Sequence, residues 1–102
     1  MKKLSPAEIR LARRSTPEWS RGRTAIQREF IFPDFVAALK FVQQVGRAAE
    51  KAQHHPDIDI RWNRVRLRLI THDAGGLTMR DFSLAARCDA LFASAIKPRT
   101  PG

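Results

Sequence analysis

The strongest constraint on the fold is a change of hydrophobic period at Pro56. Before it, residues 33–53 place apolar side chains three or four positions apart, as one face of a helix requires. After it, residues 58–71 alternate apolar and polar side chains, as half-buried strands require. Because a proline disfavours the helical conformation in the residue before it, the helix has to end near His54 or His55. The chain therefore predicts a long helix followed directly by strands.

The long helix has a recognisable start and a face that can be buried. Asp34 precedes its first apolar residue and is the expected N-cap, while Gly46 is its weak interior position. We expect the core face to be formed by Phe35, Leu39, Val42 and Ala49, flanked by Ala38, Phe41, Val45 and Ala48.

Two regions of the sequence predict strands. Residues 58–71 predict an antiparallel pair joined by a tight turn at Asn63 and Arg64. Residues 24–32 predict another strand because apolar side chains alternate along them, and we place Trp19 on a short partner strand. In the last strand we expect Val65, Leu67, Leu69 and Thr71 to face the core, and Arg64, Arg66 and Arg68 to face away.

Two further helices complete the order of elements. Ser5 as N-cap, Pro6 at the first helical position and Glu8 as the capping-box acid predict a short first helix. Thr78 as N-cap and Asp81 at the third position predict a last helix, with Leu84, Cys88, Leu91 and Ala95 on its core face. The order αββαββα predicts an α+β fold, with a four-stranded antiparallel sheet, three helices packed on one face and a polar opposite face.

Length and composition bound the class of protein. The 102 residues suit one domain, which we place at residues 1–96, followed by a flexible tail at 97–102. We expect no membrane segment, since no apolar run approaches the roughly 18 residues that a spanning helix needs. Glu8 and Arg10 interrupt any signal peptide, and the single cysteine, Cys88, suits a reducing cytoplasm. These features predict a cytoplasmic protein.

The charge of the chain leaves the question of partners open. The formal net charge is +9, and most of it comes from arginine, which pairs well with phosphate and carboxylate groups. Scattered arginines are typical of a solvated basic surface, which is the simpler interpretation. An acidic protein or a nucleic acid remains the alternative partner.

The three histidines are the residues that suggest chemistry. His54 and His55 lie at a helix end and His72 at the end of a strand, so all three are expected near the rim of the sheet. Imidazole can give and take protons near neutral pH, which suits general acid–base catalysis. A metal site is disfavoured because adjacent histidines point about 100° apart on a helix. A covalent nucleophile is disfavoured because Cys88 falls on a core face.

The spacing of these residues resembles the signature of a known family, the pterin-4a-carbinolamine dehydratases. The signature is an acidic residue, a His-His-Pro triplet, an aromatic residue, a third histidine and an aspartate. The resemblance extends over residues 19–90, including Trp19. Every gap matches at Glu50, His54, His55, Pro56, Trp62, His72 and Asp81.

The resemblance implies a fold, a reaction and an assembly. The fold is a four-stranded antiparallel sheet with three helices on one face. The reaction is removal of water from 4a-hydroxytetrahydropterin, the carbinolamine left by aromatic amino acid hydroxylases, to give quinonoid dihydropterin. It needs no metal and no cofactor. The resemblance also implies a homodimer or homotetramer.

The resemblance assigns roles to particular residues. His54 and His72 would carry the proton transfers, and His55 would orient the pterin or stabilise the transition state. Pro56 would fix the backbone after the histidines. The other expected substrate-binding positions, Thr71, Asp73 and Ala74, would present main-chain groups to the pterin ring.

Three supporting positions keep more than one interpretation. Glu50 either hydrogen-bonds a histidine or is a solvated helix residue. Asp81 is interpreted first as the capping-box acid of the last helix. Trp62 is interpreted as a packing residue rather than a pterin platform. Gln53 and Ala74 stand where relatives often carry other residues, an acid and a cysteine in some, which puts the substrate contacts in question.

Two alternative functions stay open at this point. Some relatives act as dimerisation partners of a transcription factor, so the chain is alternatively a pterin-binding or protein-binding module. The same chemistry has also been linked to molybdopterin metabolism, which would change the pterin and keep the enzyme.

Overall fold

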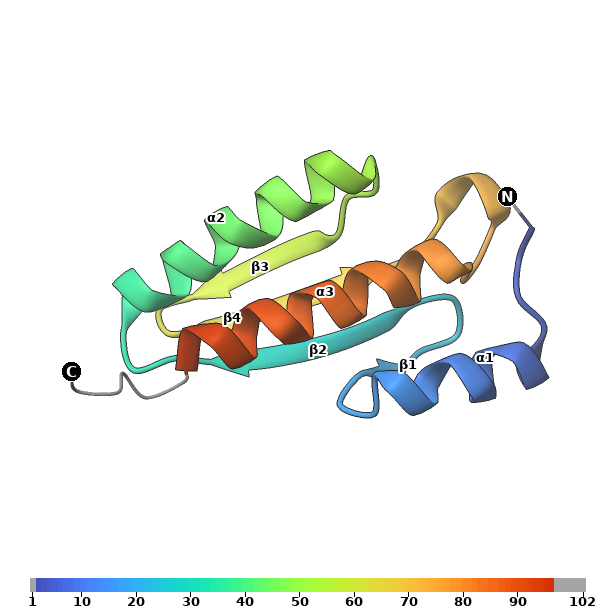
Figure 1. Cartoon of the computed structure of the whole chain (residues 1–102), viewed down its shortest axis with the longest axis horizontal. Coiled ribbons are helices and arrows are strands. Elements are labelled where there is room, and N and C mark those ends of the chain that lie inside the picture. Colours follow the sequence, from blue (N-terminus) through green and yellow to red (C-terminus); the bar gives the residue numbers. More distant parts are fainter. Residues whose placement is uncertain (1, 97–102) are drawn as a thin grey trace.

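The computed structural model describes residues 2–96, so the tail predicted at 97–102 lies outside the described residues. The elements follow the predicted order αββαββα, with two short 3₁₀ turns added (Figure 1). They are α1 (Pro6–Ala12), η1 (Arg13–Ser15), β1 (Ser20–Arg21), β2 (Ile26–Ile31), α2 (Phe35–Ala52), β3 (Asp57–Arg61), β4 (Arg64–Leu69), η2 (His72–Ala74) and α3 (Met79–Ile96).

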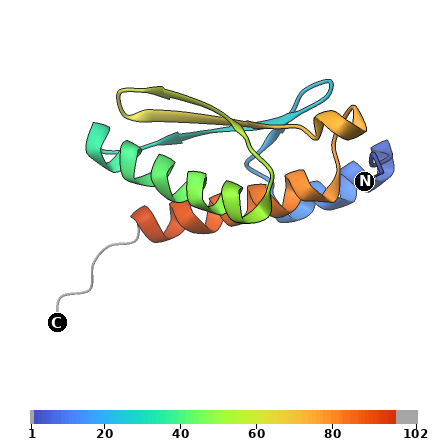
Figure 2. The same cartoon turned by 90° about the horizontal axis from the view of Figure 1, so that it is seen from above.

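The four strands form one antiparallel sheet in the order β1-β2-β4-β3. The helices lie in a single layer on one face of this sheet, as Figure 2 shows. The α+β prediction is therefore confirmed. In the central pair of strands, Ile26 lies opposite Leu69 and Phe30 opposite Val65, so their apolar side chains share the face that the helices cover.

The other face of the sheet carries charged side chains, as the alternation in β4 predicted. Carboxylates on β2 and β3 lie opposite the arginines in the register of the sheet. The ion pairs on this face join Glu29 to Arg64 and Arg66, Asp57 to Arg68, and Asp59 to Arg61. Each arginine of the predicted row thus forms an ion pair with a carboxylate on a neighbouring strand.

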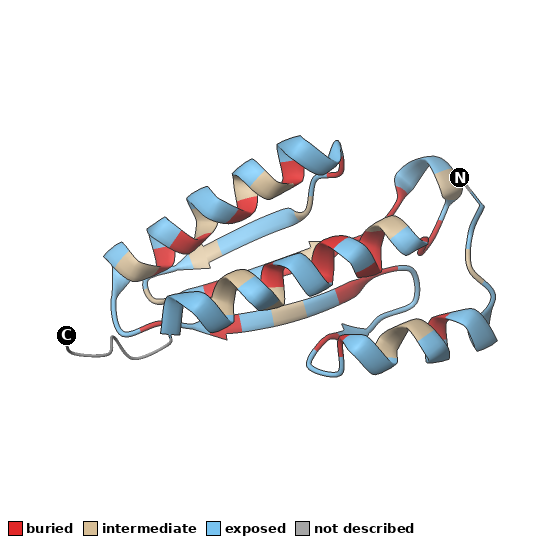
Figure 3. Cartoon of the chain, viewed as in Figure 1, coloured by how far each residue is buried: buried red, intermediate tan, exposed pale blue. Residues whose placement is uncertain are grey.

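The core lies between the sheet and the helices (Figure 3). Phe41 on α2 packs against Phe30 and Phe32, with ring centroids 4.8 Å and 5.1 Å apart. This aromatic cluster fixes the rotation of α2. The buried residues of the helix are Ala38, Phe41, Val45 and Ala49.

The predicted core face of α2 was therefore only partly right. Phe35 and Leu39 were placed in the core, but they remain 43% and 39% exposed. Of the residues expected as the flank, Ala38, Phe41 and Val45 are buried, because Phe41 turns toward the aromatic cluster. In α3 the predicted Ala95 is exposed, since it lies in the last turn, beyond the buried residues of that helix.

Two loop predictions are corrected by one residue. The β3–β4 turn consists of Trp62 and Asn63 rather than Asn63 and Arg64, because Arg61 pairs with Arg64 across the turn. The Asn63 side-chain amide donates to the carbonyl of Phe32 at 2.9 Å, which anchors the turn beside β2. Trp19 precedes β1 instead of lying within it.

Trp19 is nevertheless fully buried, and its indole joins two layers of the fold. Its Nε1–H donates to Asp89 of α3 at 2.8 Å. The same carboxylate oxygen accepts a hydrogen bond from Arg28 of β2 at 2.7 Å. The Arg28 guanidinium lies over the ring of Phe30, 4.5 Å from its centroid. This cluster ties α3 to the sheet.

The first helix begins with the predicted capping box. The Glu8 N–H donates to Ser5 Oγ at 3.2 Å, and the Ser5 N–H donates to the Glu8 carboxylate at 2.8 Å. These hydrogen bonds, that from the Ser5 backbone first, lower the pKa of Glu8. No helix within residues 2–96 combines the length and apolarity needed to cross a bilayer.

Candidate active site

The site is built where α2 ends. Gln53 adopts the left-handed conformation, with φ 53° and ψ 43°. Its N–H donates to the carbonyl of Glu50 at 3.2 Å, and the His54 N–H donates to that of Ala49 at 3.1 Å. These are the two hydrogen bonds of a Schellman motif, which reverses the chain at a helix end. His54 therefore leaves the helix, and Pro56 leads into β3.

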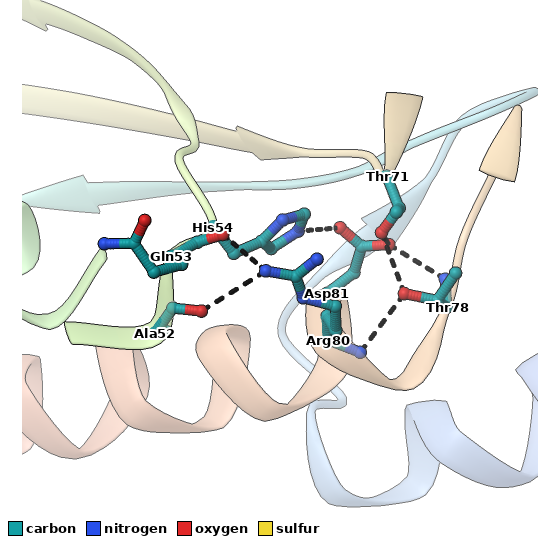
Figure 4. A network of polar contacts seen from close by, with 7 residues as sticks. All are labelled: Ala52, Gln53, His54, Thr71, Thr78, Arg80 and Asp81. Atoms are coloured by element: carbon teal, nitrogen blue, oxygen red, sulfur yellow. Dashed lines mark hydrogen bonds and ion pairs between the residues drawn. The ribbon is translucent and has the colours of Figure 1, made fainter. Parts of the chain in front are cut away.

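His54 points into the protein and meets a buried carboxylate. Its side chain is 9% exposed, and Nε2 lies 2.6 Å from Oδ1 of Asp81, which is fully buried. The second oxygen of Asp81 accepts from the Thr71 hydroxyl at 2.8 Å and from the Thr78 N–H at 2.9 Å (Figure 4). Both oxygens of this carboxylate are therefore hydrogen-bonded, as a buried charge requires.

Asp81 owes its position to the start of α3. It is the third residue of that helix, and the Arg80 N–H donates to Thr78 Oγ1 at 3.2 Å. Together with the Thr78–Asp81 hydrogen bond, this closes the capping arrangement predicted for the last helix. The capping interpretation of Asp81 is thus accurate but incomplete, because its other oxygen holds His54.

The second histidine has an exposed partner. His55 Nε2 contacts the carboxylate of Glu50, one turn back on α2. Both side chains are exposed. Of the two interpretations open for Glu50, the structure therefore shows a hydrogen bond to a histidine, and the histidine is His55 rather than His54.

All three histidines line one shallow pocket of about 210 Å³. The walls come from the end of α2, the end of β4, the η2 turn and the first turn of α3. The lining residues are Gln53, His54, His55, Ile70, Thr71, His72, Asp73 and Arg80. Residues far apart in the sequence thus meet where the sequence placed the rim of the sheet.

Three of the predicted site residues neither line this pocket nor bond one of its histidines. Pro56 and Ala74 adjoin it in the chain but are absent from its walls. Trp62 lies at the far end of β3 from the histidines and is 66% exposed, so the expectation that it packs is wrong. Nothing in a hairpin sequence separates a buried turn tryptophan from an exposed one.

Sequence reasoning missed Arg80, and it named Gln53 only as a position where relatives often carry another residue. Arg80 lines the pocket and reaches back to the end of α2, and Gln53 forms the left-handed corner there. A single arginine among 19 lysines and arginines carries no signal in the sequence. The left-handed corner could have been suspected from the need to reverse the chain before Pro56.

The remaining groups of the chain offer other chemistry little support. Cys88 is buried in the core, and burial raises the pKa of its thiol to about 12. It therefore stays protonated near neutral pH and does not face the pocket. Within residues 2–96, no group of three histidine, cysteine or acidic side chains is arranged to hold a metal ion.

The arrangement around His54 suits proton transfer. When Nε2–H donates to Asp81, the lone pair of Nδ1 is free to take a proton, and the carboxylate stabilises the imidazolium that results. The same contact fixes the ring. His72 also lines the pocket and is exposed, so a small molecule bound there can contact both histidines.

Comparison with known proteins places this chain in a family. The sequence model of the family described as "Pterin 4 alpha carbinolamine dehydratase" matches residues 2–91. A relative from Acidobacterium capsulatum is 56% identical over 91 residues, which cover 89% of this chain and 99% of that protein. A relative from Chloroflexus aurantiacus is 54% identical over 91 residues, covering 89% and 98%. The names given to both are those of pterin-4-alpha-carbinolamine dehydratases.

Solved structures agree with the sequence comparison. A transcriptional coactivator/pterin dehydratase from Brucella melitensis superposes with a TM-score of 0.84 at 37% identity, over 88% of this chain and 98% of that one. A pterin dehydratase-like RuBisCO assembly factor of the alpha-carboxysome has a TM-score of 0.62 at 21% identity, over 72% and 86%, and shares the fold. On the family match and the relatives that are more than half identical, the chain belongs to the pterin 4 alpha carbinolamine dehydratase family.

Proposed function

We propose that the protein removes water from 4a-hydroxytetrahydropterin and releases quinonoid dihydropterin. The observation that carries the proposal is the pocket in which His54, His55 and His72 meet, with His54 held by the buried Asp81. Membership of the family supports the reaction class. The fold alone would not, because one fold serves many activities.

The reaction needs one acid and one base. The 4a-hydroxyl group leaves as water once an acid protonates it, and a base takes the proton from N5 as the C4a–N5 double bond forms. The substrate loses one hydroxyl group and one proton, which together make the water released. His54 and His72 perform these transfers in our proposal. His55, steadied by Glu50, orients the pterin.

The substrate contacts proposed from the family pattern need adjustment at Thr71. Its hydroxyl is engaged with Asp81 and Thr78, and its N–H donates to the carbonyl of Gly76 at 3.1 Å. Its own carbonyl accepts from Ala74 and Gly76. We therefore propose that Thr71 supports Asp81, while Asp73, which lines the pocket, meets the pterin. Pro56 and Ala74 shape the adjoining chain.

A dehydratase assay with single variants tests the proposal. We expect the purified protein to speed the loss of the 4a-carbinolamine, and His54→Ala or His72→Ala to remove most of this activity. Lys40→Ala, on an exposed position of α2, is the control and should keep the full rate. Unchanged rates in both histidine variants would overturn the proposal.

The physiological pterin is a further part of the proposal. We propose that the protein recycles the cofactor of an aromatic amino acid hydroxylase in the cytoplasm. A neighbouring hydroxylase gene would support this setting, whereas neighbouring molybdopterin genes would favour the same chemistry on another pterin.

A protein-binding role is the second candidate. The solved relative from Brucella melitensis is described as both a coactivator and a pterin dehydratase. In this chain a groove of about 790 Å³ runs between α2 and α3, and its walls include four basic residues and no acidic ones. The basic residues are Arg47, Lys51, Arg80 and Arg87. An acidic protein suits this groove better than a nucleic acid suits the sheet, whose arginines face carboxylates.

Self-association completes the proposal. The strand order leaves β1 and β3 at the edges of the sheet, and an edge strand offers unpaired backbone groups to a second copy. We propose a homodimer or homotetramer. Light scattering at micromolar concentration tests this, and a strictly monomeric mass would contradict it.

A further inference from the structure

Arg80 joins the two helices whose ends form the pocket. It is the second residue of α3 and is half-buried. Its Nη2 donates to the carbonyl of Ala52 at 3.3 Å and also to the carbonyl of Gln53. Figure 4 shows the guanidinium extending from the start of α3 to the end of α2, beside His54.

The two carbonyls that Arg80 reaches belong to a helix end. The last carbonyls of a helix have no partner within it, and a positive charge there is favoured by the helix dipole. The Schellman motif provides donors for the carbonyls of Ala49 and Glu50 only. Arg80 provides a donor for two further carbonyls, those of Ala52 and Gln53.

The corner at Gln53 is costly without such support. Glycine is the usual residue in the left-handed conformation at a helix end, because a Cβ is crowded there. Gln53 and Trp62 are the non-glycine residues with positive φ in the described part of the chain. The residue after Gln53 is His54, so the direction in which this histidine leaves α2 depends on the corner.

Two adjacent residues of α3, Arg80 and Asp81, thus contact His54 or the residue before it. Arg80 holds the backbone before the histidine, and Asp81 holds its ring. We propose that Arg80 is a positioning residue of the site, which fixes His54 by stabilising the left-handed Gln53. The expected effect on kcat rests on the proposed function. The expected effect on the position of His54 rests on the contacts of Arg80 alone.

Steady-state kinetics give the first test. Arg80→Ala should lower kcat between about 10- and 100-fold, the loss expected when a reacting group shifts by about an ångström, with KM changed less than about threefold. Arg80→Lys should be intermediate, since an ammonium keeps the charge but lacks the planar fork. Arg10→Ala, which removes an exposed arginine of α1 outside both the pocket and the groove, should match the wild type. A raised KM with unchanged kcat in Arg80→Ala would show direct substrate binding and overturn the inference.

A rescue experiment separates positioning from general stability. Glycine adopts the left-handed conformation without a Cβ, so Gln53→Gly added to Arg80→Ala should recover at least about threefold in kcat. The rates are measured well below the melting temperature of every variant. The same glycine added to Arg10→Ala should give no gain. Equal kcat values for Arg80→Ala with and without Gln53→Gly would contradict the positioning role.

Ring nitrogen resonances of histidine keep the test independent of the dehydratase activity. If the wild-type protein fails to turn over the carbinolamine, the proposed function is lost, but His54 can still be followed by ¹⁵N NMR. Arg80→Ala should shift or broaden the Nε2 signal of His54, whereas Arg10→Ala should leave it unchanged. An unaltered His54 signal in Arg80→Ala would overturn the inference whatever the activity.

Discussion

At the scale of single residues, His54 decides what the pocket can do. A histidine on a mobile rim would sample many orientations, but the hydrogen bond to Asp81 selects one ring position and one tautomer. Asp81 is in turn fixed by Thr71 and Thr78. The catalytic geometry that we propose therefore depends on a carboxylate that does not line the pocket.

Asp81→Asn tests this dependence. The amide keeps the size of the carboxylate but has one acceptor oxygen where Asp81 uses two, so either the helix cap or the bond from His54 is lost. We predict that kcat falls at least about 100-fold, as when a positioned histidine takes the wrong tautomer. Circular dichroism should still show the folded state. A kcat within twofold of the wild type would contradict the role of Asp81.

Thr71→Val removes one hydroxyl from the same network. Valine matches the shape of threonine, so the change deletes the hydrogen bonds to Asp81 and Thr78 with little change in volume. We expect the free energy of unfolding to fall by about 1–3 kcal/mol because buried polar groups lose partners. Urea unfolding measures this. Ser15→Ala, which alters an exposed hydroxyl, is the control.

The contact between His54 and Asp81 shows why the site was only partly predictable. The spacing of the histidines and the capping pattern at Thr78 and Asp81 were visible in the sequence. Their meeting was not, because it depends on how the end of α2 and the start of α3 pack in space. Arg80 was missed for the same reason, since a long-range contact leaves no local pattern.

At the scale of elements, hydrophobic periodicity predicts where a helix lies in the sequence, and aromatic packing determines its rotation about its own axis. Hydrophobic period placed the helices and strands within a residue or two, because local spacing determines which segments can bury one face. The rotation of α2 depended on Phe41 meeting Phe30 and Phe32 from other elements. A sequence window contains neither of those partners.

The contact between α3 and the sheet can be tested by measuring the free energy of unfolding. Asp89 accepts from both Trp19 and Arg28, and its side chain is 22% exposed. We predict that Asp89→Ala lowers the free energy of unfolding by about 2–4 kcal/mol, since two donors lose their charged acceptor. Asp59→Ala, which breaks an exposed ion pair, should cost under about 1 kcal/mol. Equal losses in the two variants would contradict the structural role of Asp89.

At the scale of the whole molecule, a chain of 102 residues has a formal net charge of +9. The sheet face balances its arginines with carboxylates, whereas the groove between α2 and α3 does not. The groove therefore carries positive charge that no acidic residue of its walls offsets. The sequence supplied the sum of charges but not this distribution, because pairing across strands depends on the register.

The buried thiol of Cys88 reports on the integrity of the whole fold. Burial raises its pKa from 9.0 to about 12, so the folded state holds the proton that the unfolded chain releases above about pH 9. Stability from this group is complete below pH 9 and is lost as the pH rises toward 12. We predict a lower urea midpoint at pH 10.5 than at pH 8, and a smaller decrease in Cys88→Ala. Equal decreases in both proteins would contradict the burial of the thiol.

The most direct test of the account is the rate at which the protein converts 4a-hydroxytetrahydropterin to quinonoid dihydropterin. The absorbance of the product is followed after mixing with wild-type protein or with the double variant His54→Ala/His72→Ala. The account predicts rapid conversion by the wild type and a rate near the spontaneous one for the double variant. Conversion by the double variant at the wild-type rate, or no acceleration by the wild type, would contradict it.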